Sequence, residues 1–354
     1  MKKLKILVCA LESSSNLHLK ELKKYLPDEV EFVGIFDKSL GNPTYDISQM
    51  AVMGFVDALK KLPFFLKLKK EMLALAKDVD KVLLMDNSGF NLPLAKDIRK
   101  AYPSKEIIYY ILPQAWAWKK KRIPVIENTC DKLCSILPFE KDYYSKKEKI
   151  SYVGHPLLDE IKVFKQEQSS NNIVAFMPGS RKSEITKLMP VYKELAQKIN
   201  KKPILIIPAH FTKEYISEAY GDISDFEVSN NTHQTLIKAD FAFICSGTAT
   251  LEAAIIGTPF TLSYIAKPLD YFIAKRFLKL KYIGLANIFF EQMHKDPIHK
   301  EFIQEEVNVQ NLYNEYKNMN TDEFLKNSKI LRNYLAHGSS LNVANIILNI
   351  LIQK

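Results

Sequence analysis

Short runs of apolar residues alternate with longer segments of helical periodicity in the first half of the chain. The apolar runs cover residues 4–10, 30–36, 82–85, 107–112 and 133–137. Runs of this length, separated by helix-length segments, are typical of buried parallel strands joined by crossover helices. The pattern therefore predicts an α/β domain of the doubly wound, Rossmann-like type.

A second series of apolar runs begins after a polar stretch at residues 165–172 and covers residues 173–177, 204–207, 241–245 and 260–263. It predicts a second Rossmann-like domain, with the boundary near residue 160. We expect an N-terminal domain at 1–160, a C-terminal domain at 161–340 and a final helix at 341–354. Because this last segment is strongly apolar, it needs a docking surface, on the first domain or on a partner chain.

Composition limits the class of protein. The 354 residues fit two domains, and 50 Lys and Arg against 40 Asp and Glu give a net charge of +10. This excess favours anionic partners, namely nucleotide phosphates, nucleic acid or acidic lipid head groups, without choosing among them. Cys9, Cys130, Cys134 and Cys245 form no CxxC pair, which indicates reduced thiols in the cytoplasm and no structural zinc. Neither a secretory signal nor a membrane-spanning stretch is evident.

Two loops of the second series have the composition of phosphate-binding loops. Pro178-Gly-Ser-Arg181 follows one apolar run, and Ser246-Gly247-Thr248 follows another and opens a helix that carries Glu252. Gly179 allows close backbone approach, Ser180 can cap a helix, and Arg181 offers a fork of donors. Both loops fall at one sheet edge, so they predict a diphosphate site, with Glu252 on a ribose. The alternative is an ordinary turn and cap, with Arg181 and Glu252 solvated.

Candidate acceptor chemistry lies in the first series. Asp86 follows the run that ends at Met85, where a carboxylate can take a proton from an attacking hydroxyl or can cap the next helix. Glu12 and Ser14, which follow the first run, pose the same choice. The sequence has no Walker loop, no GxGxxG, no GxSxG and no ligand cluster for a metal. We therefore expect neither a cofactor nor a metal.

These residues resemble a known family, the lipid-A-disaccharide synthases, which are inverting glycosyltransferases of GT-B architecture. The likeness rests on motifs along nearly the whole chain: residues 50–54, 112–118 with Lys121 and Arg122, 137–140, 153–156, 178–181, 246–252, 274–276 and Asn287.

The resemblance implies two facing Rossmann-like domains, with the C-terminal helix returning toward the first. It also implies transfer of 2,3-diacylglucosamine from UDP-2,3-diacylglucosamine to 2,3-diacylglucosamine 1-phosphate, with a β-1,6 bond formed and UDP released. Asp86 becomes the base on the acceptor 6-hydroxyl, with Glu12 and Ser14 on the acceptor side. The residues assigned to the UDP-sugar are Arg181, Ser246, Gly247, Thr248, Glu252 and Asn287.

Two other functions share these features. One is a UDP-sugar 2-epimerase of the same architecture, and the other is a membrane-surface protein that binds UDP-sugars without turning them over. The family resemblance favours a cytoplasmic protein held peripherally on the inner face of the membrane, with no nucleic acid partner. The sequence allows a homodimer without indicating one.

This chain departs from the family in the first loop. The pattern Gly-Glu-x-Ser-Gly-Asp reads Leu11-Glu-Ser-Ser-Ser-Asn16, so both glycines and the final acid are missing. The Asp-x-Pro-Asp-Phe-Asn motif keeps only its ends, Asp86 and Phe90-Asn91, and Ala286 replaces the usual proline before Asn287. We therefore expect acceptor contacts that differ in detail.

A candidate membrane segment covers residues 55–75. After Pro63, one helical stripe carries Phe64, Phe65, Leu68, Met72 and Leu75, and before it another carries Phe55, Leu59 and Leu62. Five lysines lie between positions 60 and 70. Apolar residues beside lysines predict an interfacial helix in which Phe64, Phe65 and Lys67 meet the lipid. The alternative is that both stripes pack on the first sheet.

Overall fold

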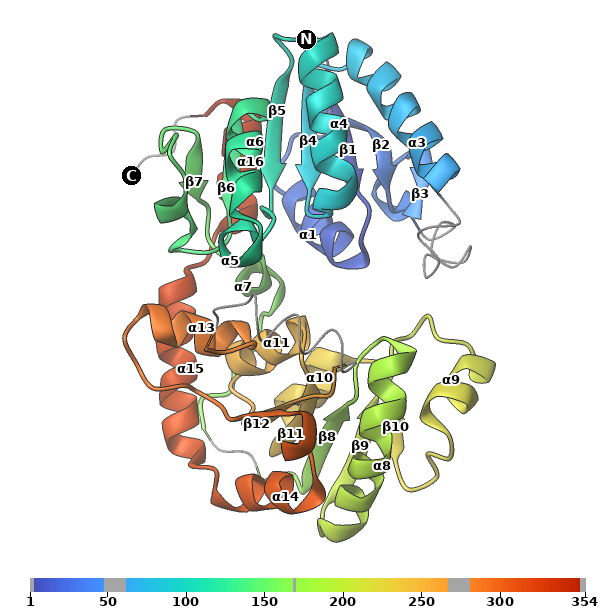
Figure 1. Cartoon of the computed structure of the whole chain (residues 1–354), viewed down its shortest axis with the longest axis vertical. Helices are drawn as coiled ribbons and strands as arrows, with labels where there is room; N and C mark the ends of the chain where they lie inside the picture. Colours follow the sequence, from blue (N-terminus) through green and yellow to red (C-terminus); the bar gives the residue numbers. More distant parts are fainter. Residues whose placement is uncertain (1–2, 48–61, 168–169, 267–280, 351–354) are drawn as a thin grey trace. The chain divides into compact units, whose positions relative to one another are not determined.

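The computed structural model describes residues 3–47, 62–167, 170–266 and 281–350. The chain divides into two compact units, Met1–Glu160 with Leu335–Lys354, and Ile161–Tyr334. Each unit contains one parallel β-sheet with helices (Figure 1). The motifs at 50–54 and 274–276, and the apolar positions Phe55 and Leu59, lie outside the described residues.

The first unit contains a seven-stranded sheet in the order β3-β2-β1-β4-β5-β6-β7, with all neighbouring strands parallel. The central strands are buried along almost their whole length, which is why they read as continuous apolar runs in the sequence. The strands are β1 (Lys5–Ala10), β2 (Glu31–Phe36), β3 (Tyr45–Asp46), β4 (Lys81–Met85), β5 (Glu106–Tyr110), β6 (Lys132–Ser135) and β7 (Ile150–Tyr152).

Helices cover both faces of this sheet, because alternate residues of each strand point to opposite sides. Ile6 and Val8 of β1 belong to one core cluster, and Leu7 and Cys9 belong to the other. The helices are α1 (Ser13–Lys23), α3 (Leu62–Leu75), α4 (Ser88–Ala101), α5 (Ala115–Trp118), α6 (Ile123–Thr129), α7 (Pro156–Glu160) and α16 (Ser339–Leu348). Residues of α1 and α16 join the first cluster, and residues of α3, α4 and α6 join the second.

The last helix, α16, belongs to the first unit (Figure 1). Its Val343 and Ile347 are buried in the same core cluster as the central strands. The carboxylate of Asp159 accepts hydrogen bonds from the backbone N–H of Gly338, at 2.8 Å, and of Ser340, at 2.7 Å. A carboxylate at the start of a helix satisfies N–H groups that have no partner within the helix, so Asp159 fixes α16 to α7.

The second unit has a six-stranded parallel sheet in the order β10-β9-β8-β11-β12-β13. Its strands are β8 (Ile173–Met177), β9 (Lys202–Ile206), β10 (Glu227–Ser229), β11 (Phe241–Cys245), β12 (Phe260–Tyr264) and β13 (Glu301–Ile303). Its helices are α8 (Lys182–Lys198), α9 (Lys213–Tyr220), α10 (Thr232–Lys238), α11 (Thr248–Ile256), α13 (Leu285–Gln292), α14 (Val309–Asn318) and α15 (Thr321–Leu335). The prediction of two Rossmann-like domains is confirmed.

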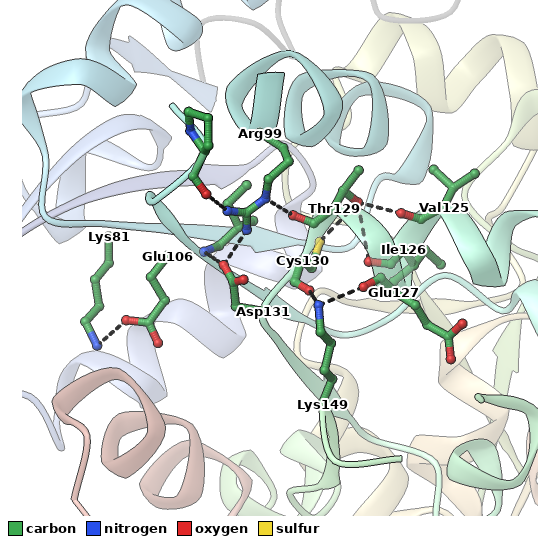
Figure 2. A network of polar contacts seen from close by, with 12 residues as sticks. Lys81, Arg99, Glu106, Val125, Ile126, Glu127, Thr129, Cys130, Asp131 and Lys149 are labelled. Atoms are coloured by element: carbon green, nitrogen blue, oxygen red, sulfur yellow. Dashed lines mark hydrogen bonds and ion pairs between the residues drawn. The ribbon is translucent and has the colours of Figure 1, made fainter. Parts of the chain in front are cut away.

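Ion pairs join the amino ends of the strands in the first unit (Figure 2). Lys81, at the start of β4, lies 2.7 Å from the carboxylate of Glu106, at the start of β5. Arg99 of α4 pairs with Asp131, just before β6, at 2.5 Å and donates to the carbonyl oxygen of Thr129 at 3.1 Å. These charges fix neighbouring strands at one edge of the sheet. The candidate catalytic and binding residues lie at the opposite side, beyond the carboxyl ends of the strands.

Candidate active site

Strand order places the candidate loops at special positions in both sheets. The order reverses between β1 and β4 in the first sheet, and between β8 and β11 in the second. In open parallel sheets, ligands bind beyond the carboxyl ends of the strands at such a reversal, because the two following helices lie on opposite faces. The loops that carry Glu12, Asp86, Arg181 and Ser246 follow these four strands.

Asp86 is not the cap of the helix that follows it. The N-cap of α4 is Asn87, whose side-chain oxygen accepts from the backbone N–H of Phe90 at 3.2 Å. Asp86 and Asn87 have φ angles of 49° and 34°, so two consecutive non-glycine residues adopt the left-handed conformation. Such strain is costly and concentrates at functional sites. Because Asn87 is the cap, Asp86 does not cap α4, and its carboxylate is available for chemistry.

The backbone of Asp86 is fixed on two sides. Its carbonyl oxygen accepts from the hydroxyl of Tyr109 at 2.7 Å and from the side-chain amide of Asn91 at 3.0 Å. The Asn91 amide also donates to the carbonyl oxygen of Met85 at 3.0 Å. Burial raises the pKa of the Asp86 carboxyl, although a hydrogen bond from the Asn87 backbone and the nearby charge of His18 oppose the shift. A raised pKa makes this carboxylate a stronger base.

The loop after β1 meets the Asp86 loop. A carboxylate oxygen of Glu12 accepts from the side-chain amide of Asn87 at 3.2 Å, while Ser14 lies half-buried in the first turn of α1. Asn16 is buried, and its amide nitrogen donates to the carbonyl oxygens of Ala10, at 2.9 Å, and Glu12, at 2.8 Å. Asn16 thus holds the loop together. It has a structural task in this chain.

His18 and Glu160 belong to the same region, and sequence reasoning missed both. Nδ1 of His18, on α1, is bonded to the Glu160 carboxylate on α7, and both side chains are largely buried. His155 is also buried, and desolvation lowers its pKa to about 3, so its imidazole is neutral at physiological pH. In the sequence, the one hint of this pair was His18 itself, a histidine within a predicted helix. Its partner is too distant in the chain to be recognised.

The motif at residues 137–140 forms a buried polar cluster behind this edge. The Ser135 hydroxyl oxygen lies 2.6 Å from a carboxylate oxygen of Glu140 and 3.0 Å from the carbonyl oxygen of Leu137. Burial raises the pKa of Glu140 to about 8. The rings of Trp116 and Phe139 pack edge to face, with centroids 4.9 Å apart. The motifs at 112–118 and 137–140 therefore contact each other inside the core through Trp116 and Phe139.

In the second unit, the Pro178–Arg181 loop is tightly packed against β11. Gly179 has φ of 103°, and a Cβ atom there would lie 2.7 Å from a Glu184 carboxylate oxygen and 3.1 Å from the sulfur of Cys245. The prediction that Ser180 caps the helix is wrong, because α8 begins at Lys182 with Arg181 as its N-cap residue. The guanidinium of Arg181 lies 2.6 Å from Glu184, while 76% of its side chain remains exposed. Arg181 is thus oriented by Glu184 and accessible to an anion.

The Ser246–Thr248 loop leaves a helix N-terminus open. Gly247 is the N-cap of α11, and in the part of the chain that the structure describes this end of the helix receives no side-chain cap. Gly247 and Thr248 are exposed, and no atom of the described residues lies within 4 Å of the position where a Cβ of Gly247 would stand. The uncapped N–H groups and the positive end of the helix dipole favour a phosphate. Glu252 lies one turn further along the same face, 3.3 Å from His233 on α10.

Asn287 is placed differently from the other predicted donor residues. It is fully buried on α13, where its amide nitrogen donates to Glu301, at 2.8 Å, and to the carbonyl oxygen of His299, at 2.9 Å. Its side-chain oxygen accepts from the backbone N–H of His299 at 3.3 Å. Both amide protons are therefore in use, so Asn287 positions the segment before β13. Direct contact with the donor remains a prediction.

The candidate membrane residues on α3 separate into two groups. Leu68 and Met72 are core residues, and Phe64 and Phe65 are partly buried against the same cluster. Phe64 packs edge to face on Tyr45, and Phe65 packs on Phe90. This packing supports the alternative interpretation for the two phenylalanines. The exposed face of α3 instead carries Leu66, which is 48% exposed, and Lys67, whose side chain is 72% exposed.

Clusters of metal ligands and membrane-spanning helices are both absent from the described residues. In that part of the chain, no three His, Cys, Asp or Glu side chains are placed to hold a metal ion together. Of the helices described, none has the length and apolar character needed to cross a membrane.

Comparison with known proteins decides the family. Residues 6–345 match the model of the lipid-A-disaccharide synthetase family. The chain belongs to this family. It is 49% identical over 353 residues to the lipid-A-disaccharide synthase of Helicobacter pylori strain G27, with 96% of this chain and 97% of the relative covered. The enzyme of Campylobacter jejuni strain RM1221 is also 49% identical, over 365 residues, with 96% and 98% covered.

Solved structures share the fold of this lipid-A-disaccharide synthetase family member at low sequence identity. A Staphylococcus aureus MnaA–UDP structure aligns with a TM-score of 0.64 and 14% identity, covering 99% of this chain and 98% of the other. Acinetobacter baumannii MurG aligns with a TM-score of 0.55 and 11% identity, covering 98% and 99%. These likenesses establish the GT-B fold, and the family places the chain among the glycosyltransferases.

Proposed function

We propose that this chain transfers 2,3-diacylglucosamine from its UDP derivative to 2,3-diacylglucosamine 1-phosphate, forming the β-1,6 disaccharide of lipid A and UDP. The family match over residues 6–345 is the observation that carries this proposal. Structural likeness to UDP-sugar 2-epimerases, at 12% to 15% identity, concerns the fold alone and does not favour epimerisation.

Asp86 is proposed as the general base on the acceptor 6-hydroxyl. Three observations support this role. Asp86 follows β4 at the strand-order reversal, it does not cap α4, and its pKa is raised. The acceptor oxygen attacks the anomeric carbon of the donor while Asp86 takes its proton, and the bond to UDP breaks. Inversion at that carbon gives the β linkage.

The departing UDP carries the negative charge that develops in this reaction. We assign its diphosphate to the open N-terminus of α11 and to Arg181, because uncapped N–H groups and a preoriented guanidinium stabilise that charge. Glu252, on the same face of α11, is assigned to the ribose hydroxyls. Ser246 and Thr248 supply further donors beside the phosphates.

The test uses the full chain with donor and acceptor, followed by mass analysis of the lipid product and measurement of UDP release. We expect a disaccharide, and UDP release only when acceptor is present. A changed monosaccharide would indicate an epimerase, and UDP-sugar binding without turnover would indicate a non-catalytic protein. Asp86→Asn should lower turnover roughly 100-fold or more while leaving UDP affinity unchanged. Asp97→Asn, on the outer part of α4, is the matched control.

A peripheral membrane contact is proposed at the exposed face of α3. Both substrates are lipids, and Leu66 and Lys67 present an apolar and a basic side chain to solvent. Each lysine near an anionic surface contributes about 1 kcal/mol, so salt should weaken the attachment. Leu66→Ser/Lys67→Glu should keep the fold and reduce sedimentation with anionic vesicles. Phe64→Ser/Phe65→Ser should mainly lower stability; unchanged sedimentation of the first variant would place the contact elsewhere.

A further inference from the structure

Four consecutive basic residues, Lys119, Lys120, Lys121 and Arg122, follow β5 and have no role in the reaction described above. The last three form a 3-10 turn between α5 and α6. Strand β5 lies beside β4 in the sheet, so this turn emerges next to the Asp86 loop at the carboxyl edge. Positive charge is thus concentrated beside the proposed base.

Arg122 touches the Asp86 loop directly. Its guanidinium donates to the Ser88 hydroxyl oxygen at 2.8 Å, and Ser88 is the first residue of α4. Ser88 is two residues from Asp86, so the guanidinium lies beside the loop that carries the proposed base. Among the described residues, Arg122 forms no ion pair with a carboxylate. Donors of its fork therefore remain for an anion.

The neighbouring lysines add charge without being neutralised by the core. Lys120 and Lys121 are exposed, and the ammonium of Lys120 lies 5.5 Å from the centroid of the Tyr143 ring. A cation–π contact orients this side chain while keeping its charge. The positive end of the α4 dipole, beside Ser88, acts in the same direction.

The proposed acceptor carries an anion that matches this arrangement. Its reacting 6-hydroxyl, on the hydroxymethyl group of C5, and its 1-phosphate, on C1, flank the ring oxygen of the same pyranose, and a phosphate monoester holds nearly two negative charges at neutral pH. When the hydroxyl is at Asp86, the phosphate needs a cation within the reach of that ring. We propose that Arg122, assisted by Lys120 and Lys121, binds the acceptor phosphate and selects phosphorylated acceptors. This inference rests on the proposed function.

The experiment compares two acceptors in the full chain, one with the 1-phosphate and one with a free 1-hydroxyl. Arg122→Ala should raise KM for the phosphorylated acceptor roughly 10- to 100-fold, the range for a lost charge-assisted contact, and should change KM for the hydroxyl acceptor less than about threefold. Arg122→Lys should recover part of the loss. Lys96→Gln, which removes an exposed charge from α4, is the control and should leave both KM values unchanged.

Equal effects on both acceptors would overturn the proposal, because Arg122 would then only position the Ser88 loop. If Arg122→Ala does not fold, Lys121→Gln provides the same comparison at an exposed position, with a smaller rise expected for the phosphorylated acceptor alone. Lipid head groups are a second source of phosphate. Loss of sedimentation with anionic vesicles at unchanged KM would assign the cluster to them and overturn the proposal. If the wild type makes no disaccharide from either acceptor, the proposed function itself fails.

Discussion

Replacing Glu140 with glutamine should remove a pH-dependent loss of stability from the first unit. The Ser135 hydroxyl has one proton, yet its oxygen lies 2.6 Å from Glu140 and 3.0 Å from the carbonyl oxygen of Leu137. If Glu140 is protonated, it donates to Ser135, and Ser135 donates to Leu137. If Glu140 is ionised, the single proton of Ser135 can serve only one of the two contacts, to Glu140 or to Leu137. The other contact then brings two acceptor oxygens together without a proton. The geometry therefore fits a neutral acid, as does its pKa of about 8.

The direction in which stability changes with pH follows from proton binding. The folded pKa of Glu140 is raised above the ordinary value of 4.5, so the folded protein keeps a proton that the unfolded chain releases between about pH 4.5 and 8. The stability contributed by this group is fully present below the ordinary pKa and is lost as pH rises to the folded value. The loss is about 1.4 kcal/mol per pH unit, or roughly 2–3 kcal/mol between pH 5 and 7.

Urea unfolding followed by tryptophan fluorescence gives the measurement. Both tryptophans, Trp116 and Trp118, belong to the first unit, so their signal reports on that unit. Glutamine keeps a donor toward Ser135 but cannot ionise. Glu140→Gln should therefore match the wild type at pH 5 and exceed its stability increasingly toward pH 8. Glu148→Gln, at an exposed position, is the control for net charge. A difference between wild type and Glu140→Gln that is the same at every pH would refute the neutral acid.

Three further predictions concern residues beyond the carboxyl ends of the strands in the two sheets. Arg181→Ala and Glu252→Ala should each weaken UDP binding, the first because phosphate donors are lost and the second because a ribose partner is lost. Calorimetric titration with UDP measures both affinities, and unchanged values would contradict both roles. Asn16→Asp should destabilise the first unit by roughly 2–4 kcal/mol, because a carboxylate would face two carbonyl oxygens, and an unchanged urea midpoint would dismiss that structural role. Since the pKa of Asp86 is raised from 3.8, the acidic limb of kcat/KM should lie above the ordinary carboxyl range, and a limb at or below pH 4 would count against it as the base.

Strand positions were predictable because buried parallel strands are nearly continuous apolar runs. The predicted run at 82–85 became β4 (Lys81–Met85), and the run at 241–245 became β11. The edge strands β3 and β7 were missed, since they have only two and three residues and are partly polar. Local sequence contains little information about such short pairings, which depend on the neighbouring strand.

The candidate site was predictable only where chemistry and local order coincide. Asp86 stood out because it directly follows a buried strand, but its release from capping depends on Asn87 in the left-handed conformation. His18 and Glu160 meet through the packing of α1 on α7, which no local pattern reveals. An apolar stripe with lysines fits either a core or a bilayer. For this reason periodicity alone could not assign Phe64 and Phe65.

The place of α16 in the first unit has a consequence for synthesis of the chain. The core face that contains Ile6, Val8 and Leu83 is completed by Val343 and Ile347, which leave the ribosome only after the entire second unit. At 5–20 residues per second, that interval lasts roughly 10–40 s. During this time the nascent first unit lacks the α16 residues that complete this core, which leaves part of an apolar face accessible to chaperones. The order of translation thus makes the N-terminal half of this enzyme the last part to finish folding.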